Sequence, residues 1–364
     1  EHDVENKIVR LLLTVTAIGA AKFPAKIVAA ADAPDWIKNM ADYVCDGVDD
    51  QEEINSALAE ANCVVLSPGT FIITSSIIVP SHRILRGFGR ATTILCNGDR
   101  SSDISYIVNS DPTNGNEDIT IQDLVIDVNG EVDQYGSWDG MYFELVRFLR
   151  VKNVVFKNYT CDGIYLSYCD HYKIEECVFS CFYDLVDAWV PCGIDLGTSH
   201  FGLICDNTFG SPDDIEGGYW IYITYSHGVH IEKNRFFQSY YESIDIAYSC
   251  RDVHLTDNWF KGSMSESYTV LLRNSVYDTI IDGNRFNAEG LESPPDYCIQ
   301  ISDNTVSNTM IHGNDFRNGA ATGEVSDSGT GTLMRDNVAL GLSLIHISEP
   351  TRPLYISYAV FCLK

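Results

Sequence analysis

Hydrophobic and polar residues alternate in short segments along most of the chain, and these segments recur at intervals. In each segment every second residue is aliphatic, which is the period of a β-strand that buries one face. The aliphatic positions at the centres of six segments are Ile164, Ile194, Ile221, Ile244, Val270 and Ile299. We expect them to point to one side and to stack, repeat over repeat, as an interior ladder.

A second motif, I-x-x-N-x-F, follows these segments from the middle of the chain onward. Its period is typical of solenoids, and the irregular spacing favours a β-helix with variable loops over leucine-rich repeats. We expect the phenylalanines to stack inside and the asparagines to form a ladder at a turn, because a buried amide needs hydrogen-bond partners. The asparagines, spaced by 27, 24, 26, 30 and 23 residues, are Asn207, Asn234, Asn258, Asn284, Asn314 and Asn337. The phenylalanines, including two weaker copies, are Phe156, Phe179, Phe209, Phe236, Phe260, Phe286 and Phe316.

These repeats predict an all-β chain folded as a right-handed parallel β-helix, a solenoid of about 8–10 coils. Residues 49–61 predict a helix, because the run from Asp49 to Glu53 can cap and start it. Ile54, Ala57, Leu58 and Ala61 fall on one face. That face should cover the open end of the coils, as the terminal unit of a solenoid must. The predicted domains are an N-terminal strand or extension over residues 1–40 and the β-helix over residues 41–340.

Three motifs near the start of this region resemble the entry of pectate-lyase-like β-helix proteins. They are CDGVDD at residues 45–50, VVLSPGTF at residues 64–71 and LRGFGR at residues 85–90. The resemblance implies the same fold over roughly residues 40–340. The superfamily includes polysaccharide lyases, glycoside hydrolases, epimerases, phage tailspikes and surface proteins, so the fold does not name the reaction. It implies a polysaccharide partner and a secreted, surface or virion-associated protein, and it admits a trimer, the common state of tailspikes.

Both ends of the sequence differ from the repeats. Residues 7–21 fit either the remnant of a secretion signal or a β-strand, and Thr14, Val15 and Ile18 favour the strand. Residues 342–352, LSLIHISEPTR, resemble translated sequencing-adapter DNA. We therefore expect residues 341–364 to be a non-native, adapter-like tail without a functional role.

The charge balance excludes several classes of function. The chain carries 24 Lys and Arg against 51 Asp and Glu, a net charge of −27. Such a surface repels nucleic acid, whose phosphates need clustered Lys and Arg. It also disfavours a polyanionic glycan unless a cation bridges the two, so Ca²⁺ is the one cofactor that the composition admits. The composition, 45% hydrophobic, predicts no membrane span, and the 12 cysteines include no CxxC pair for zinc or redox chemistry.

Residues between the ladder positions should point outward and share one face of the predicted sheet. Coils stack about 4.8 Å apart, so Asp195 and Asp245, two coils apart, should lie roughly 10 Å from each other. This is near the upper limit of the about 6.5–9.5 Å that separates the two carboxyl groups of an inverting glycosidase. Tyr222 between them can stack on a sugar ring, which predicts a sugar groove; the alternative is an ordinary solvated sheet face. The outward residues are Tyr165, Asp195, Tyr222, Asp245, Leu271 and Gln300.

Other acids, one base and several aromatic residues border this face. Asp162 and Glu242 come just before two of the strands, and Arg273 follows one coil later. Together with Ca²⁺ they would suit a polyuronate lyase, which needs acidic metal ligands and a base that removes a proton. Further candidates for sugar stacking, in loops beside the groove, are Trp189, Trp220 and Tyr268.

Polygalacturonase-type hydrolases are matched only in part. The run TCDGIYL at residues 160–166 resembles the first acidic motif of that family, with Asp162 in the place of its aspartate. Before the next strand the family has an aspartate pair, where this chain has Pro191 and Cys192. Before the following strand it has His-Gly, where this chain has Gly218 and Tyr219. The departures leave that activity without support.

A zinc site is an alternative on two adjacent coils. His227, His230, Cys250 and His254 offer imidazole and thiolate, the ligands that zinc prefers. Stacked surface histidines without a metal are the simpler interpretation, because His227 and Cys250 fall in turns that can aim elsewhere.

Two hypotheses for the function follow. The first is an extracellular polysaccharide-acting protein, either a lyase or a glycoside hydrolase, that uses the face with Asp195, Tyr222 and Asp245. The second is a non-catalytic β-helix of a phage tail or cell surface that binds glycan or spaces other domains. The sequence leaves the substrate and the oligomeric state open.

Overall fold

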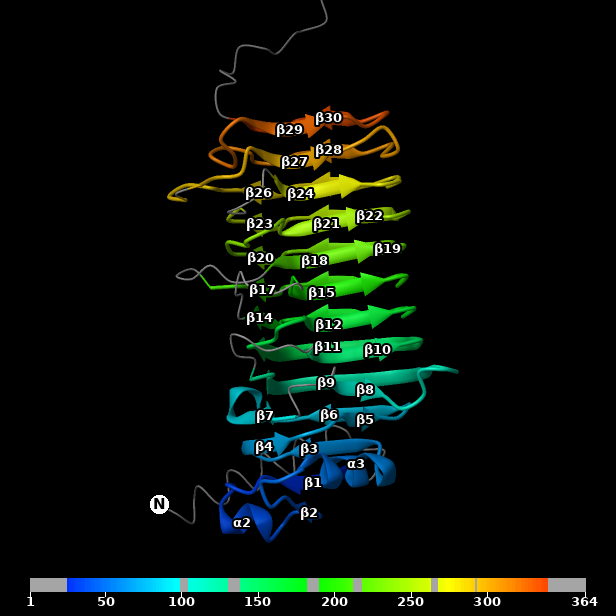
Figure 1. The fold of residues 1–364 in the computed structure, drawn as a ribbon, viewed down its shortest axis with the longest axis vertical. Coiled ribbons are helices and arrows are strands. Elements are labelled where there is room, and N and C mark those ends of the chain that lie inside the picture. Colours follow the sequence, from blue (N-terminus) through cyan, green and yellow to red (C-terminus); the bar gives the residue numbers. More distant parts are fainter. Residues whose placement is uncertain are drawn as a thin grey trace, which may run out of the picture.

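The chain winds into a β-solenoid. The computed structural model describes residues 25–98, 104–129, 138–181, 190–211, 218–262, 268–291 and 293–339. In these ranges the chain is mostly β-strand, and parallel strands stack one over another in about nine turns (Figure 1). The predicted right-handed parallel β-helix is therefore confirmed, including its number of coils.

One wall of the solenoid is a ten-stranded sheet, which we call the short-strand wall. Each coil contributes one strand, and neighbouring strands are parallel. In order along the axis the strands are β5 (Ile77–Val79), β8 (Ile104–Asn109), β10 (Trp138–Glu144), β12 (Asp162–Ser167), β15 (Cys192–Gly197), β18 (Tyr219–Thr224), β21 (Ile244–Ala247), β24 (Tyr268–Arg273), β27 (Tyr297–Ile301) and β29 (Gly323–Asp327).

The other two walls belong to one twenty-stranded sheet. It turns a corner at the long strands β9 and β11, each of which pairs with strands of both walls. Its strands are β1 (Ala25–Ala29), β2 (Tyr43–Val44), β3 (Cys63–Leu66), β4 (Gly69–Ile73), β6 (Arg83–Arg86), β7 (Thr92–Cys96), β9 (Asn116–Asp127), β11 (Val146–Lys157), β13 (Lys173–Glu175), β14 (Val178–Ser180), β16 (Leu203–Cys205), β17 (Thr208–Phe209), β19 (His227–Glu232), β20 (Arg235–Phe236), β22 (Arg251–Thr256), β23 (Trp259–Phe260), β25 (Ile280–Asp282), β26 (Arg285–Phe286), β28 (Met310–His312) and β30 (Leu333–Arg335).

Two stacks of side chains fill the interior. The aliphatic ladder runs in register from Ile164 to Ile299, and its members have no exposed surface. The phenylalanine rings stack from Phe156 to Phe316 with centroids 4.7–5.2 Å apart. Both predicted stacks are confirmed, and burial of this apolar surface is the main force that holds successive coils together.

The asparagines form the predicted ladder at a turn between the two other walls. From Asn207 to Asn337, each side-chain nitrogen donates to the side-chain oxygen of the next asparagine, at 3.0–3.1 Å. The same nitrogen donates to a backbone carbonyl of the preceding coil, as Asn234 does to Ile204 at 2.9 Å. Because their hydrogen bonds are used within the ladder, these asparagines are structural.

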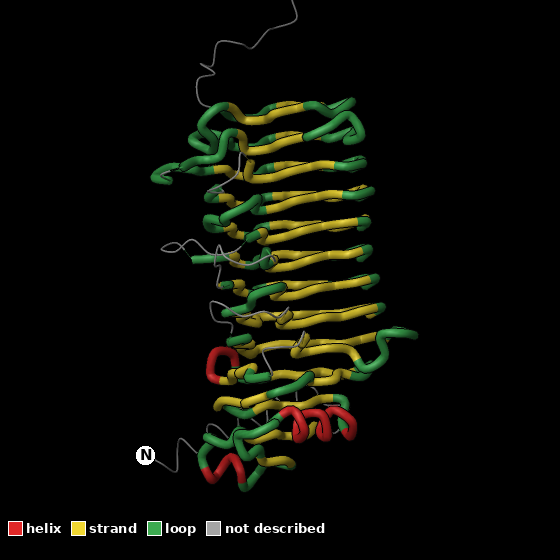
Figure 2. The backbone as a smooth tube through the Cα atoms, in the orientation of Figure 1, coloured by secondary structure: helices red, strands yellow, loops and turns green. Residues whose placement is uncertain are grey.

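The helices lie at the N-terminal end of the solenoid (Figure 2). They are α2 (Asp35–Lys38), α3 (Gln51–Glu60) and a short 3-10 turn, η1 (Gly89–Ala91). Helix α3 starts after Asp50 and buries Ile54, Ala57 and Leu58, so the predicted cap helix is present. No helix in the described ranges has both the length and the apolar character needed to cross a lipid bilayer.

The β-helix begins earlier than the boundary expected at residue 41. Strand β1 pairs in parallel with β3, with Ala25 opposite Cys63, so it already belongs to the twenty-stranded sheet. Val28 and Ala29 of this strand have no exposed surface, which explains why it joins the solenoid. The segments over residues 7–21 and 341–364, for which the sequence made separate predictions, lie outside the described residues.

Candidate functional site

The outer face of the short-strand wall carries the predicted row of side chains. The pairing register places one member of the row on each of six successive strands, β12 to β27. From coil to coil the row is Tyr165, Asp195, Tyr222, Asp245, Leu271 and Gln300. Tyr142 of β10 precedes it, with its ring centroid 5.1 Å from that of Tyr165.

Three carboxyl groups gather at the upstream end of this face, and we call Asp139, Asp162 and Asp195 the acid cluster. Oxygen and sulfur atoms of Asp139, Cys161 and Asp162 lie within 4.8 Å of one another, as do those of Asp162, Cys192 and Asp195. The backbone N–H of Asp162 donates to Asp139 at 3.2 Å, and that of Cys192 donates to Asp162 at 3.2 Å. These bonds fix one carboxyl group against the next across three coils.

Glycines behind the acid cluster explain why the backbone can hold it there. Gly140, Gly163 and Gly193 occupy equivalent positions on three coils, and each faces a ring of the phenylalanine stack. A Cβ atom at these positions would lie only 2.9–3.0 Å from the ring and 2.7 Å from a backbone carbonyl oxygen of the next coil. On these three coils a larger residue would have to displace the ring or the adjacent strand, and with it the neighbouring carboxyl group.

The electrostatics of the acid cluster favour protonated carboxyl groups. Burial, followed by repulsion from Asp139 and Asp195, raises the pKa of Asp162 well above its usual range. Burial and the charge of Asp139 raise the pKa of Asp195 to about 7. Near neutral pH, Asp195 therefore exchanges its proton readily, which is the property of a general acid.

Asp245, farther along the same face, has a different environment. Its side chain is only 1% exposed, and Arg273 binds it with Nη2 at 2.8 Å and Nε at 3.2 Å from each oxygen. Burial raises the pKa of Asp245, while Arg273 opposes that rise. The pair also raises the pKa of Arg273 above its already high value, so this guanidinium cannot act as a base.

Tyrosines surround both acidic regions. The rings of Tyr219 and Tyr222 stack with centroids 5.7 Å apart, and Tyr241 stacks on Tyr219 at 5.3 Å. Burial and the nearby Glu242 raise the pKa of Tyr219, which places this buried acid beside the tyrosine group. Tyr268 stacks on a tyrosine of the following coil at 6.4 Å.

The prediction that Trp220 borders the groove is wrong. Its side chain is fully buried, and its Nε1–H donates to the carbonyl oxygen of Phe237 at 2.8 Å. In β18 Trp220 follows Tyr219 directly and packs near Phe209, on the side where preceding coils have glycine. Trp189, predicted as a similar residue, lies outside the described residues.

The four predicted zinc ligands do not converge. His227 packs on His200 with ring centroids 3.7 Å apart, whereas His230 packs on His254 at 4.5 Å. Cys250 is buried and donates to the carbonyl oxygens of Ile223 and Ala247. Among the described residues, the groups of His, Cys, Asp and Glu that could hold an ion lie elsewhere.

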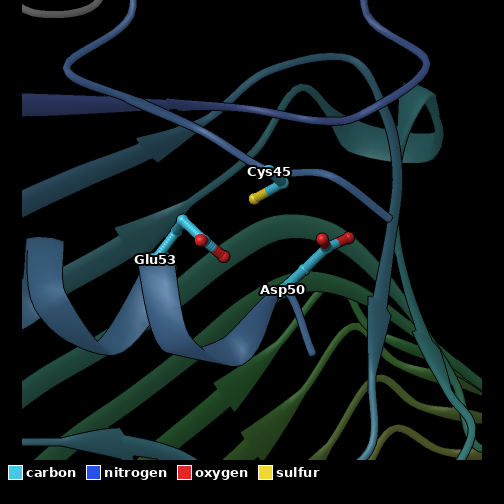
Figure 3. A group of neighbouring side chains, drawn as sticks. All are labelled: Cys45, Asp50 and Glu53. Carbon is cyan, nitrogen blue, oxygen red and sulfur yellow. The ribbon is translucent and has the colours of Figure 1, made fainter. Parts of the chain in front are cut away.

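Those groups do not suit Ca²⁺, which takes six to eight oxygen ligands. The acid cluster offers three carboxyl groups interleaved with two cysteines. A further group, Cys45, Asp50 and Glu53, surrounds the start of α3 (Figure 3). There Asp50 already accepts hydrogen bonds from the backbone N–H groups of Gly47 at 2.9 Å and Ile72 at 2.7 Å. Its role is therefore to fix the cap.

Asp139 is the residue of the site that sequence reasoning missed. The available signal was a repeated sequence: DGMYF at residues 139–143 matches DGIYL at residues 162–166, one coil later. The register confirms the match, because Met141 pairs with Ile164 and Tyr142 with Tyr165.

A cavity of about 530 Å³ lies away from the acid cluster. It opens on the twenty-stranded sheet, and its lining includes Cys63 of β3, Ile84 of β6, Thr120 of β9 and Phe148 of β11. None of the carboxyl groups of the short-strand wall lines it.

Comparison with known proteins places the chain among β-helix proteins. The family model described as periplasmic copper-binding protein (NosD) matches residues 188–340. No curated protein sequence matches the chain. At 12% identity, the endo-xylogalacturonan hydrolase of Aspergillus tubingensis superposes with a TM-score of 0.59 over 87% of this chain and 92% of the hydrolase.

Two other solved structures have comparable similarity. The tailspike of E. coli bacteriophage HK620, solved in complex with a pentasaccharide, is 13% identical with a TM-score of 0.61 over 80% of this chain and 63% of the tailspike. The surface adhesin PfbA of Streptococcus pneumoniae is 15% identical with a TM-score of 0.55 over 80% of this chain and 89% of the adhesin. At such identities the likeness shows the fold alone, a parallel β-helix, and a fold does not name an activity.

Proposed function

We propose that this protein binds a polysaccharide across the short-strand wall and hydrolyses it, with Asp195 as the proton donor. The observation that carries the proposal is the acid cluster, in which three carboxyl groups meet and burial beside like charges raises the pKa values of Asp162 and Asp195. Glycoside hydrolysis needs one carboxyl group that is protonated at the working pH, and burial beside like charges is how proteins provide it.

Asp139 is the partner that we assign to Asp195. Its charge is the second cause, after burial, of the raised pKa of Asp195, so the two groups lie within electrostatic reach. Asp162 lies between them, and burial together with the charges of Asp139 and Asp195 raises its pKa well above the usual range. We assign Asp162 a positioning role, because it accepts the backbone N–H of Cys192, three residues before Asp195.

The predicted pair of Asp195 and Asp245 is less suited to catalysis. Both oxygens of Asp245 accept from Arg273, and the side chain is almost fully buried. An inverting mechanism needs a carboxylate free to activate water. The same salt bridge argues against a lyase, because Arg273 was the only base predicted for proton removal and holds its proton.

The similar structures support the proposed location and substrate of this protein without showing either. A tailspike solved with a pentasaccharide and a surface adhesin share the fold, which supports a glycan partner and a secreted or surface position. Copper is not part of the proposal. Of the described cysteines in residues 188–340, only Cys192 joins a group that could hold an ion, and burial raises the pKa of its thiol.

The test is an assay on a panel of neutral polysaccharides and polyuronates, with and without Ca²⁺. New reducing ends report hydrolysis, and ultraviolet absorbance of unsaturated uronides reports elimination. We expect reducing ends from the wild type and a loss of about 10²- to 10⁴-fold in Asp195→Asn, the usual effect of removing a general acid. Asp278→Asn, an exposed turn residue outside the short-strand wall, is the matched control and should keep full activity.

Non-catalytic glycan binding is the second candidate function. It is favoured by one observation. Of the acids in and beside the row, Asp139, Asp162, Glu242 and Asp245 are all buried, and only the side chain of Asp195 is partly exposed to solvent. Binding without product on any glycan would establish this function and reject hydrolysis. Full activity of Asp195→Asn would show that the reaction takes place at another site.

A further inference from the structure

The solenoid turns at two edges that are built from residues with left-handed backbone. At the turn that carries the asparagine ladder, these residues are polar; examples that directly precede a ladder asparagine are Asp206, Lys233 and Asp257. The other edge follows the strands of the short-strand wall. The five stacked residues of this edge, which we call the tyrosine edge, are Leu145, Tyr168, Thr198, Tyr225 and Tyr248.

Large apolar side chains are unexpected at such positions. A left-handed backbone strains a residue with a Cβ by about 1–2 kcal/mol, and Asn, Asp and Gly are the residues that tolerate it best. Among the described residues with positive φ, every Leu, Phe and Tyr lies in residues 145–248, either in the tyrosine edge or, as Phe148 and Phe201 do, three residues after one of its members. The next coil uses Asn274 in the place of Tyr248.

The tyrosines of this edge are also exposed to solvent. Tyr168 is 57% exposed, Tyr225 53% and Tyr248 38%, and the first two are among the largest exposures of any large apolar or aromatic side chain in the described ranges. Neither strain nor exposure of an aromatic ring stabilises the fold. A patch that combines them points to a contact with another molecule.

The geometry of the patch continues the face of the short-strand wall. The rings of Tyr225 and Tyr248 are stacked, with centroids 5.9 Å apart and planes 18° apart. Arg273 lies 5.4 Å from the Tyr248 ring and donates to its hydroxyl oxygen at 3.5 Å, while its other nitrogens hold Asp245. Along β18 and its turn, Tyr219, Tyr222 and Tyr225 cross from one side of the wall to the other.

We propose that the tyrosine edge is a binding platform for a neutral polysaccharide chain that also crosses the acid-bearing face. The glycan partner rests on the function proposed above, and the platform adds a second contact area and a substrate class. Tyrosine rings stack on the apolar faces of sugars and offer a hydroxyl group to their polar rims. Arg273, the cation that contacts Tyr248, is already paired with Asp245, and a chain of net charge −27 repels polyanions.

The residue that follows the tyrosine edge on the next coil, Asn274, suggests a substitution that tests the platform. Tyr225→Asn with Tyr248→Asn introduces the residue that the chain uses at Asn274, so the fold should be kept and Tm should stay equal or rise. Affinity electrophoresis in gels with xyloglucan or mixed-linkage β-glucan measures binding, and gels with alginate or polygalacturonate test anionic glycans. We expect the double variant to bind neutral glycans at least tenfold more weakly.

Two further variants serve as controls for the double variant. Tyr225→Asn alone leaves the contact between Tyr248 and Arg273 intact and should weaken binding in the same direction. Lys233→Asn makes the matched change at a left-handed residue of the polar edge and should leave binding unchanged. A drop of several degrees in Tm for the single variant would show that the tyrosine is structural and would overturn the proposal.

The remaining outcomes separate the platform from the hydrolysis. A wild type that binds neutral glycans without forming product keeps the platform and rejects the hydrolase. Unchanged binding by the double variant, binding of anionic glycans alone, or the loss of a dimer in the double variant each overturns the platform. In those cases, reducing ends from short soluble oligosaccharides still decide the activity of Asp195.

Discussion

The acid cluster and the Asp245–Arg273 pair lie on the same wall, yet their carboxyl groups have different environments. The carboxyl groups of the acid cluster and that of Asp245 are positioned by the pairing register between successive coils, and they are largely buried. In the acid cluster the neighbours of Asp195 are other carboxyl groups, whereas Asp245 meets a guanidinium from the next coil. Equivalent positions of a solenoid thus acquire opposite chemistry from a single residue of an adjacent coil, without a change of backbone.

Breaking the ion pair should give the largest effect on stability. Arg273→Met leaves the carboxylate of Asp245 buried with no partner, so we expect the free energy of unfolding to fall by about 3–5 kcal/mol. Urea denaturation at neutral pH measures it. The double variant Asp245→Asn with Arg273→Met removes the orphaned charge and should recover much of the loss. A single-variant loss below about 1 kcal/mol would mean that solvent reaches Asp245 and that its contrast with the acid cluster is false.

Raising the pH should lower the free energy of unfolding, because of the acid cluster. The pKa of Asp195 is about 7 in the folded protein, against 3.8 for an unperturbed group, so the folded state holds the proton more tightly. Its contribution to stability is therefore full below about pH 4 and is lost as the pH rises toward 7, with a slope of at most about 1.4 kcal/mol per pH unit. Asp162, whose pKa is also raised, extends the loss to higher pH.

Asp195→Asn should make the free energy of unfolding depend less on pH. Urea unfolding at a series of pH values from 4 to 8 would show a smaller loss of stability in the variant than in the wild type. Asp303→Asn is a contrasting control, because hydrogen bonds lower the pKa of Asp303 to about 2 and its contribution is lost only in acid. An identical slope for the wild type and Asp195→Asn would remove the physical basis of the proposed proton donor.

The repetitive part of the structure could be predicted from the sequence. The ladders of Ile164, Asn207 and Phe209 each recur at equivalent points of the repeat, and every member makes the same contact with its copy one coil away. Register in such a fold follows from buried patterning alone, because a shift by one residue would expose the aliphatic ladder. The outward row through Asp195 and Tyr222 followed from the same alternation.

The chemistry of the site depended on contacts that break the repeat. Trp220 looks like a groove residue in sequence, but it points into the core where earlier coils have glycine. The salt bridge joins Asp245 to Arg273, which is not its register partner; Leu271 is. Diagonal contacts of this kind depend on side-chain rotamers, and no periodicity encodes them.

Tyr222 lies between the two regions and offers the mildest test of whether they serve one ligand. It pairs with Asp195 on one side and Asp245 on the other, and it keeps part of its surface exposed. Tyr222→Ala should weaken binding of a neutral polysaccharide by about 1 kcal/mol, roughly fivefold, with little effect on stability. Tyr222→Phe keeps the ring and should bind almost as the wild type does. If both variants bind equally weakly, the hydroxyl group rather than the ring makes the contact; if neither differs from the wild type, no glycan passes from the acid cluster to the tyrosine edge across this coil.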